Sequence, residues 1–192
     1  MNQTLNSDFA ATQATASPLD TILSEFEQNV VRKHTAAPLR MTGKMVFHAT
    51  KDEVFHQVSD PAQMASWFPT LRRIDLDHST SCTIGKMGEG SNRVCHMTGM
   101  GALNEKIVHW DEGKSYAYSA SNFMMPIKNH ISFMHLTEDE PGVTTLVWKH
   151  YFNFTGLIMR HMFPTMMTMM MNMGMKTLAK RLGGPGGKMS TV

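Results

Sequence analysis

Cysteine is scarce in this sequence of 192 residues, which contains only Cys82 and Cys95. Two cysteines cannot build a disulfide framework, and their separation does not match the spacing of metal ligands. Charge is also sparse, because charged residues make up 18% of the chain and the formal net charge is +2. Without a continuous basic stripe the electrostatic footprint of a nucleic-acid-binding protein is missing, so we expect no nucleic-acid partner.

Long hydrophobic runs are missing as well. The most apolar stretch, residues 157–175, is interrupted by Arg160, His161, Pro164 and Asn172, which argues against a membrane span. Residues 1–17 are rich in Thr, Ala, Gln and Asn and contain neither the basic nor the apolar region of a secretion signal. We therefore expect a cytoplasmic protein in which residues 1–17 form a disordered tail.

What the chain does have is enough apolar sequence for one folded domain, and a large excess of methionine. The hydrophobic fraction is 42%, and 20 residues are methionine. A chain of this length fits one domain with flanking tails.

The first third of the chain predicts a helix, a strand and two short helices. After Ser17-Pro18, apolar residues at helical spacing predict an amphipathic helix that ends near His34, and residues 18–38 form this helix and a linker. Alternating residues 39–49 predict a strand. Thr50 and Glu53 form a capping box for a helix to Ser59, and Asp60-Pro61 starts a second helix that Pro69 stops.

The remaining sequence alternates in strand period between turn residues and then becomes helical. Six further strands are predicted at residues 71–78, 91–98, 103–110, 115–123, 128–137 and 144–154. Residues 156–182 predict a long helix, and the Gly-rich residues 183–192 a flexible tail. This order predicts an α+β fold with a seven-stranded, curved antiparallel sheet covered by the C-terminal helix. A cavity between sheet and helix is expected.

Several segments in this order resemble the START-like SRPBCC superfamily, in its polyketide cyclase/dehydrase branch. They are residues 48–55 (HATKDEVF), 58–61 (VSDP), 67–69 (WFP), 88–93 (GEGSNR), 105–111 (EKIVHWD) and 144–148 (TTLVW). The resemblance implies a helix-grip domain over residues 39–182, with a pocket for lipids, sterols, polyketides or similar molecules. Some members transport such molecules and others cyclise or dehydrate them. Since the family has no common catalytic set, no catalytic residue or cofactor is carried over.

Arg93 and Glu105 lie on consecutive predicted strands, where strand period places both on the inner face with Cys95, Ile107 and His109. One interpretation is a polar clamp, in which Arg93 holds an anionic group of a ligand and Glu105 orients it or exchanges a proton. The alternative is a cross-strand ion pair without a role in binding.

The last two strands carry two histidines that are candidates for the pocket wall. His150 alternates with Trp148, and His130 lies on the preceding strand, so either imidazole is a candidate base at neutral pH. The alternative is a hydrogen-bonded core histidine. Tyr118 offers a hydroxyl and Trp67 a ring at the pocket mouth, although either residue also suits simple packing.

Methionines repeat along the C-terminal helix at Met162, Met166, Met169 and Met173, a spacing of one helical face. Flexible thioethers in such a stripe are suited to line a pocket for varied apolar ligands. The alternatives are core filling, with a surface for self-association, and a copper(I) site made by Met166, Met169, Met170 and Met173. No histidine pair has the spacing of a helical zinc site, so no metal site is assigned.

The leading hypothesis is therefore a protein that binds a small hydrophobic molecule. The expected contacts are Trp67, Arg93, Glu105, His109, Tyr118, His130, Trp148, His150, Met162, Met166, Met169 and Met173. The alternative is a cyclase or dehydratase that uses Glu105, His130 or His150 as acid or base. A third possibility is a homodimer formed through the helix at residues 19–30 or through the methionine surface.

Overall fold

The computed structural model describes residues 17–156 and 159–192, together with the side chains of residues 17–156 and 162–192. The chain begins as one continuous helical segment, made of α1 (Pro18–Phe26), the π-helical turn η1 (Glu27–Val31) and α2 (Arg32–His34). The side chain of Ser17 caps this segment by accepting a hydrogen bond from the Asp20 amide. The helix predicted to end near His34 is confirmed, whereas residues 1–16 of the expected tail lie outside the described part.

Strand β1 (Leu39–Phe47) leads into α3 (Lys51–Ser59) and α4 (Pro61–Trp67). The capping box is present, since the Glu53 amide donates to Thr50 Oγ1 at 3.3 Å and the Thr50 amide donates to Glu53 Oε2 at 2.9 Å. Asp60 caps α4 by accepting from the Gln63 amide at 3.0 Å. These local signals fix both short helices beside the sheet.

Within the described residues the sheet has eight strands, one more than the sequence predicts. After β1 come β2 (Leu71–Asp77), β3 (Asn92–Met97), β4 (Gly101–Asp111), β5 (Ser115–Ser121), β6 (Ile127–Glu140) and β7 (Val143–Phe154). The C-terminal helix α5 (Met159–Leu182) follows, and β8 (Gly186–Thr191) ends the chain. All pairs are antiparallel, in the order β2-β3-β4-β5-β6-β7-β1-β8.

Strand β8 corrects the prediction of a flexible tail at residues 183–192. It pairs with the free edge of β1, and its Met189 side chain is buried. The side-chain amide of Asn172 on α5 holds it in place, because Asn172 Nδ2 donates to the Met189 carbonyl at 3.1 Å and Oδ1 accepts from the Met189 amide at 2.7 Å. The glycines before it form the tight connection from α5 rather than a loose end.

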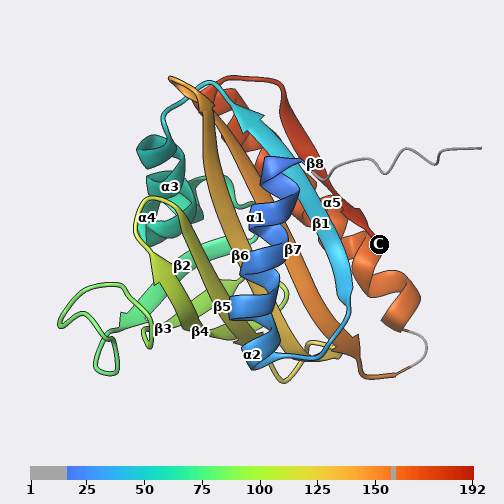
Figure 1. The fold of residues 1–192 in the computed structure, drawn as a ribbon. Coiled ribbons are helices and arrows are strands. Elements are labelled where there is room, and N and C mark those ends of the chain that lie inside the picture. Colours follow the sequence, from blue (N-terminus) through green and yellow to red (C-terminus); the bar gives the residue numbers. More distant parts are fainter. Residues whose placement is uncertain (1–16, 157–158) are drawn as a thin grey trace, which may run out of the picture.

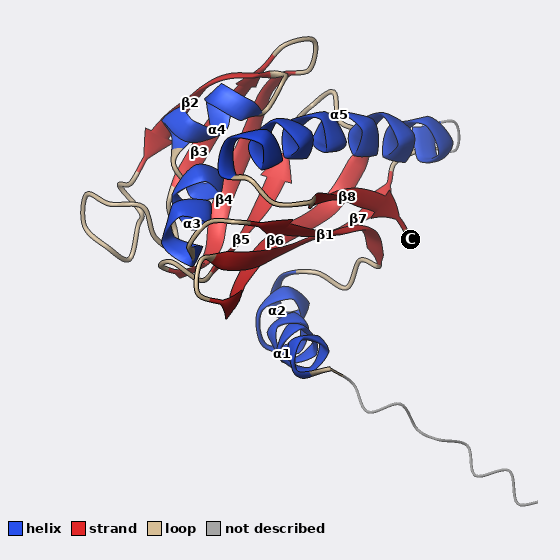
Figure 2. Cartoon of the chain, turned by 90° about the horizontal axis from the view of Figure 1, so that it is seen from above, coloured by secondary structure: helices blue, strands red, loops and turns tan. Residues whose placement is uncertain are grey.

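The two faces of the sheet are covered by different helices (Figures 1 and 2). Helices α3, α4 and α5 lie over the inner face, and the N-terminal helix lies on the opposite, outer face (Figure 2). Each face has its own core. The inner core includes Met41, Phe47 and Tyr116, and the outer core packs Leu23 against Phe133 and neighbouring strand residues. The predicted α+β layout with a cover on the inner face is confirmed, with a second cover added outside.

None of the helices within the described residues is long and apolar enough to cross a membrane.

Candidate functional site

A cavity of about 80 Å³ lies between the inner face of the sheet, α4 and α5. Its wall is almost entirely apolar and unusually rich in sulfur. The methionines that line it are Met41, Met64, Met97, Met100, Met125, Met167, Met170 and Met171, and Cys95 adds a thiol. Aromatic rings come from Trp67, Phe68, Tyr118, Trp148, Phe152 and Phe163. Since thioether side chains are flexible and polarisable, this wall is able to reshape around an apolar molecule.

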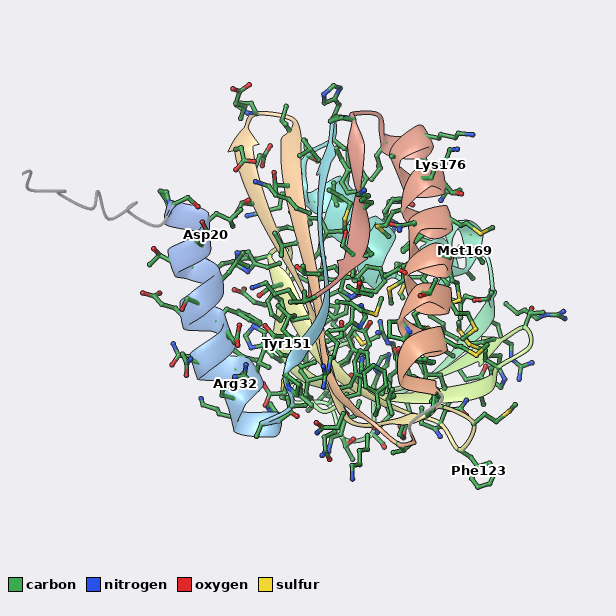
Figure 3. The ribbon with its side chains drawn as sticks, turned by 90° about the vertical axis from the view of Figure 1, so that its right-hand side faces the viewer. Asp20, Arg32, Phe123, Tyr151, Met169 and Lys176 are labelled. Carbon is green, nitrogen blue, oxygen red and sulfur yellow. The ribbon has the colours of Figure 1, made fainter. Side chains whose placement is uncertain are left out.

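The face of α5 that meets the cavity is not the one that the methionine spacing predicts. Met162, Met166, Met169 and Met173 are 64%, 44%, 63% and 54% exposed. Figure 3 shows Met169 on the side of α5 away from the sheet. Phe163, Met167, Met170 and Met171 line the cavity instead. The prediction that Met162, Met166, Met169 and Met173 line a pocket is therefore wrong.

The same geometry is unfavourable for a copper(I) site on this helix. Of the four methionines considered, Met166, Met169 and Met173 are exposed, while Met170 is buried at the cavity. Met170 accepts a hydrogen bond at its sulfur from Thr70 Oγ1, at 3.1 Å. The four thioethers thus lie on two sides of the helix and do not gather at one point.

Arg93 and Glu105 form a buried cross-strand ion pair. The two residues are direct partners in the β3–β4 register. Arg93 Nε donates to Glu105 Oε2 at 2.9 Å, and Nη2 lies 2.6 Å from the same oxygen. The Arg93 guanidinium also lies over the rings of Tyr116 and Tyr118, at 5.5 and 5.3 Å from their centroids. Of the pair, only Glu105 is among the residues that line the cavity.

This environment keeps Arg93 charged and occupied. Burial is the largest single effect and disfavours its charged form, but the Glu105 carboxylate together with the nearby Tyr116, Cys95 and Tyr118 groups raises the pKa of Arg93 above its ordinary value. Beside the pair, burial and the same carboxylate raise the pKa of the Cys95 thiol far above its usual range. The clamp interpretation required Arg93 to face the ligand, whereas the structure places it in contact with Glu105 and the two tyrosines.

His130 and His150 form a second pair on the cavity wall. Both side chains are buried, at 8% and 3% exposed, and both line the cavity. His130 Nε2 and His150 Nδ1 lie 3.3 Å apart and share a hydrogen bond. Asn129, with a φ of 55°, sits in an irregularity of β6 just before His130. After this irregularity the strand alternates again, which places His130 and Ser132 on the inner face.

Both histidines are neutral at physiological pH. Burial lowers the pKa of His130 to about 4, and burial together with the neighbouring His130 lowers the pKa of His150 well below its ordinary value. Within the part of the chain that the structure describes, His130 Nδ1 and His150 Nε2 have no hydrogen-bond partner. In the described part of the chain, no hydrogen bond or ion pair joins this pair to Arg93 or Glu105.

The remaining aromatic candidates also lie on the cavity wall, with their polar atoms mostly engaged. Trp67 Nε1 donates to the Gln57 carbonyl at 2.8 Å, and Trp148 Nε1 donates to Ser132 Oγ at 2.8 Å. Tyr118 is buried, which raises the pKa of its hydroxyl well above the ordinary value. These three residues therefore offer ring surface to the cavity.

His109 is on the opposite side of the sheet from the position predicted for it. The register of β4 against β5 shifts between Ile107 and His109, which marks a β-bulge. Because a bulge inserts one extra residue, the alternation of faces changes there. His109 therefore packs on the outer face, with its ring 5.1 Å from that of Phe26 in α1.

Much of the apolar wall, including Met41, Leu71 and Phe152, is not among the contacts that the sequence predicts. For Phe152 a signal was present, because it continues the inner alternation of Trp148 and His150 on β7. Met41 lies on β1, which carries none of the predicted contacts. For α5, methionine occurs on both sides of the helix, so apolar spacing alone does not distinguish the inner face.

Comparison with known proteins agrees with this architecture. Residues 38–183 match the family described as polyketide cyclase/dehydrase and lipid transport. A comparison with proteins of curated function gave no match. Among solved structures, XoxI from Bacillus cereus superposes with a TM-score of 0.62 at 16% identity, over 76% of this chain and 96% of that one.

Two further solved structures share the fold. The START superfamily protein from Mycobacterium smegmatis gives a TM-score of 0.59 at 11% identity, over 74% of this chain and 97% of the other. Norcoclaurine synthase from Thalictrum flavum, in complex with dopamine and hydroxybenzaldehyde, gives 0.55 at 10% identity, over 79% and 90%. Identities this low show the fold alone. The match over residues 38–183, however, shows that this chain belongs to the polyketide cyclase/dehydrase and lipid transport family, with a START-like fold.

Proposed function

We propose that this protein binds a small, largely apolar molecule in the cavity between the sheet and α5. The observation that carries the proposal is the composition of the wall, where the described residues combine eight methionines with aromatic rings and a few buried polar atoms. Ligand sites are typically apolar, with a small number of polar groups that fix orientation. The norcoclaurine synthase structure, with two small aromatic molecules bound, is consistent with such use of this fold.

The cavity must enlarge to hold such a ligand. Its volume is about 80 Å³, whereas ligand pockets usually measure roughly 300–1,000 Å³. Methionine side chains have several rotatable bonds and repack at low cost, so the wall contributed by Met167, Met170 and Met171 is the part best suited to move. The protein would then adjust to its ligand instead of holding a rigid template.

An enzymatic cyclase or dehydratase function is the second candidate, and the polar geometry favours it less. Acid/base catalysis on a carbonyl compound calls for a base and an anion-stabilising donor close to one reacting atom. Here the Arg93 charge is already neutralised by Glu105, and the histidines bond to each other. The base and the cationic donor thus belong to two separate pairs, and this separation supports binding over turnover.

Native mass spectrometry of the freshly purified protein, followed by organic extraction, tests the proposal. A retained apolar molecule is the expected result. Met170→Lys, which places a charge at the cavity wall, should abolish retention, whereas Met169→Lys on the exposed side of the same helix should not. If the folded protein retains nothing and binds no apolar probe, the proposal is wrong.

A further inference from the structure

The His130–His150 pair leaves one unsatisfied nitrogen at each end, and both residues belong to the cavity wall. A buried polar atom without a partner is energetically unfavourable, so such atoms are rare in folded proteins. Here two of them, His130 Nδ1 and His150 Nε2, lie in one pair, which is unexplained by packing alone. A ligand that supplies a hydrogen-bond partner would relieve this cost.

The chemistry of two neutral imidazoles fixes what that partner must be. Each ring has one N–H and one lone pair, and the shared bond between Nε2 and Nδ1 uses one of each. If His130 donates in this bond, His150 Nε2 carries a hydrogen and His130 Nδ1 accepts. If His150 donates, the two roles exchange. A hydroxyl group, which both donates and accepts, fits either end of the pair in either arrangement.

Charge on the ligand is disfavoured by the rest of the wall. No lysine or arginine occurs among the described residues that line the cavity, and the guanidinium of Arg93 beside it is neutralised by Glu105. An anionic group would therefore lose its hydration without gaining a cation, and it would approach the Glu105 carboxylate. A cationic group would find a carboxylate that is already paired with Arg93.

We infer that the ligand is a neutral alcohol or phenol whose hydroxyl hydrogen-bonds to the free nitrogen at one end of the His130–His150 pair, while its apolar body contacts the methionines and rings. This inference rests on the proposed function and narrows its ligand class. In particular it excludes ionised carboxylic acids, such as fatty acid anions, as preferred ligands.

Three probes that share the naphthalene ring system test this inference by isothermal titration calorimetry at pH 7. They are 2-naphthol, 2-methylnaphthalene and 2-naphthoate. The comparison between wild type and variants cancels the different water solubilities of the probes. We expect 2-naphthoate to bind at least tenfold more weakly than 2-naphthol. In His150→Phe or His130→Phe, the preference for 2-naphthol over 2-methylnaphthalene should fall about tenfold, while 2-methylnaphthalene itself binds within threefold of its wild-type Kd.

His135→Phe is the matched control. His135 is also buried and its Nδ1 also has no partner in the described chain, but it packs under Phe26 on the outer face of the sheet. Its replacement should leave the probe preference unchanged. His150→Gln, whose amide reaches the same region as the ring nitrogen, provides a second variant that restores part of the preference if His150→Phe folds poorly.

The outcomes distinguish the inference of a hydroxyl-bearing ligand from the proposed apolar binding function. If 2-methylnaphthalene binds wild type but the preference for 2-naphthol is the same in both cavity variants, the hydroxyl inference is wrong and the apolar binding function stands. Tight binding of 2-naphthoate would likewise overturn the inference. If none of the three probes binds the wild-type protein, the proposed function itself fails, and the inference fails with it.

Discussion

Replacing Arg93 by methionine should destabilise the protein severely, because it leaves the Glu105 carboxylate buried without its partner. Glu105 is only 7% exposed, and its Oε2 receives both contacts from Arg93. Breaking a buried ion pair by removing one partner typically costs about 3–5 kcal/mol. Loss of the two cation–π contacts to Tyr116 and Tyr118 adds up to about 2 kcal/mol each, because the Arg93 side chain is fully buried.

A double-mutant cycle measured by urea unfolding gives the coupling between the two residues. Glu105→Gln alone should also cost about 3–5 kcal/mol, since it leaves the Arg93 charge uncompensated. The double variant should be clearly more stable than the sum of the single effects predicts, by roughly 3 kcal/mol or more. Arg73→Met, which removes an exposed pair with Asp75 on neighbouring β2, is the control and should leave the midpoint unchanged. Small and additive changes in the free energy of unfolding would show that the Arg93–Glu105 pair is solvated and not buried.

Three further predictions concern stability. Met189→Ala should lower the free energy of unfolding in urea by about 2–3 kcal/mol, because it leaves a cavity between β8 and α5. Met169→Ala on the exposed side of α5 should lower it by less than about 0.5 kcal/mol. Equal effects of the two substitutions would refute the burial of β8. Leu23→Ala should lower the free energy of unfolding by about 2–4 kcal/mol, because Leu23 belongs to the outer core. An unchanged free energy of unfolding would show that the N-terminal helix is not part of the folded core. Burial lowers the pKa of His130 from 6.5 to about 4, so the unfolded chain binds this proton before the folded protein does as the pH falls. The free energy of unfolding should therefore drop by about 2 kcal/mol from pH 7 to pH 5. Urea unfolding of wild type and His130→Phe checks this, and an equal dependence of the urea midpoint on pH in both proteins would contradict it.

The order of elements was predictable from the sequence because local signals specify it. The capping box at Thr50 and Glu53, the Asp60-Pro61 start and the alternation of the strands act over a few residues, and each is present in the structure. The inner position of His150 also followed from its alternation with Trp148.

Where the sequence prediction was wrong, a nonlocal or ambiguous cause is visible. The bulge that turns His109 outward depends on the pairing of β4 with β5, and local alternation does not reveal it. Strand β8 is short and rich in glycine, and it exists because the edge of β1 and Asn172 hold it. Methionine on both sides of α5 removes the contrast between faces on which a helical pattern depends.

The central claim, that the cavity under α5 takes up a small apolar molecule, is tested most directly by NMR of the methionine methyl groups. In protein labelled with ¹³C at these methyls, addition of 2-naphthol should shift the signals of Met167, Met170 and Met171, which line the cavity. The signals of the exposed Met162, Met166, Met169 and Met173 should stay in place. Shifts confined to these exposed methionines, or no shifts at saturating probe, would contradict the account.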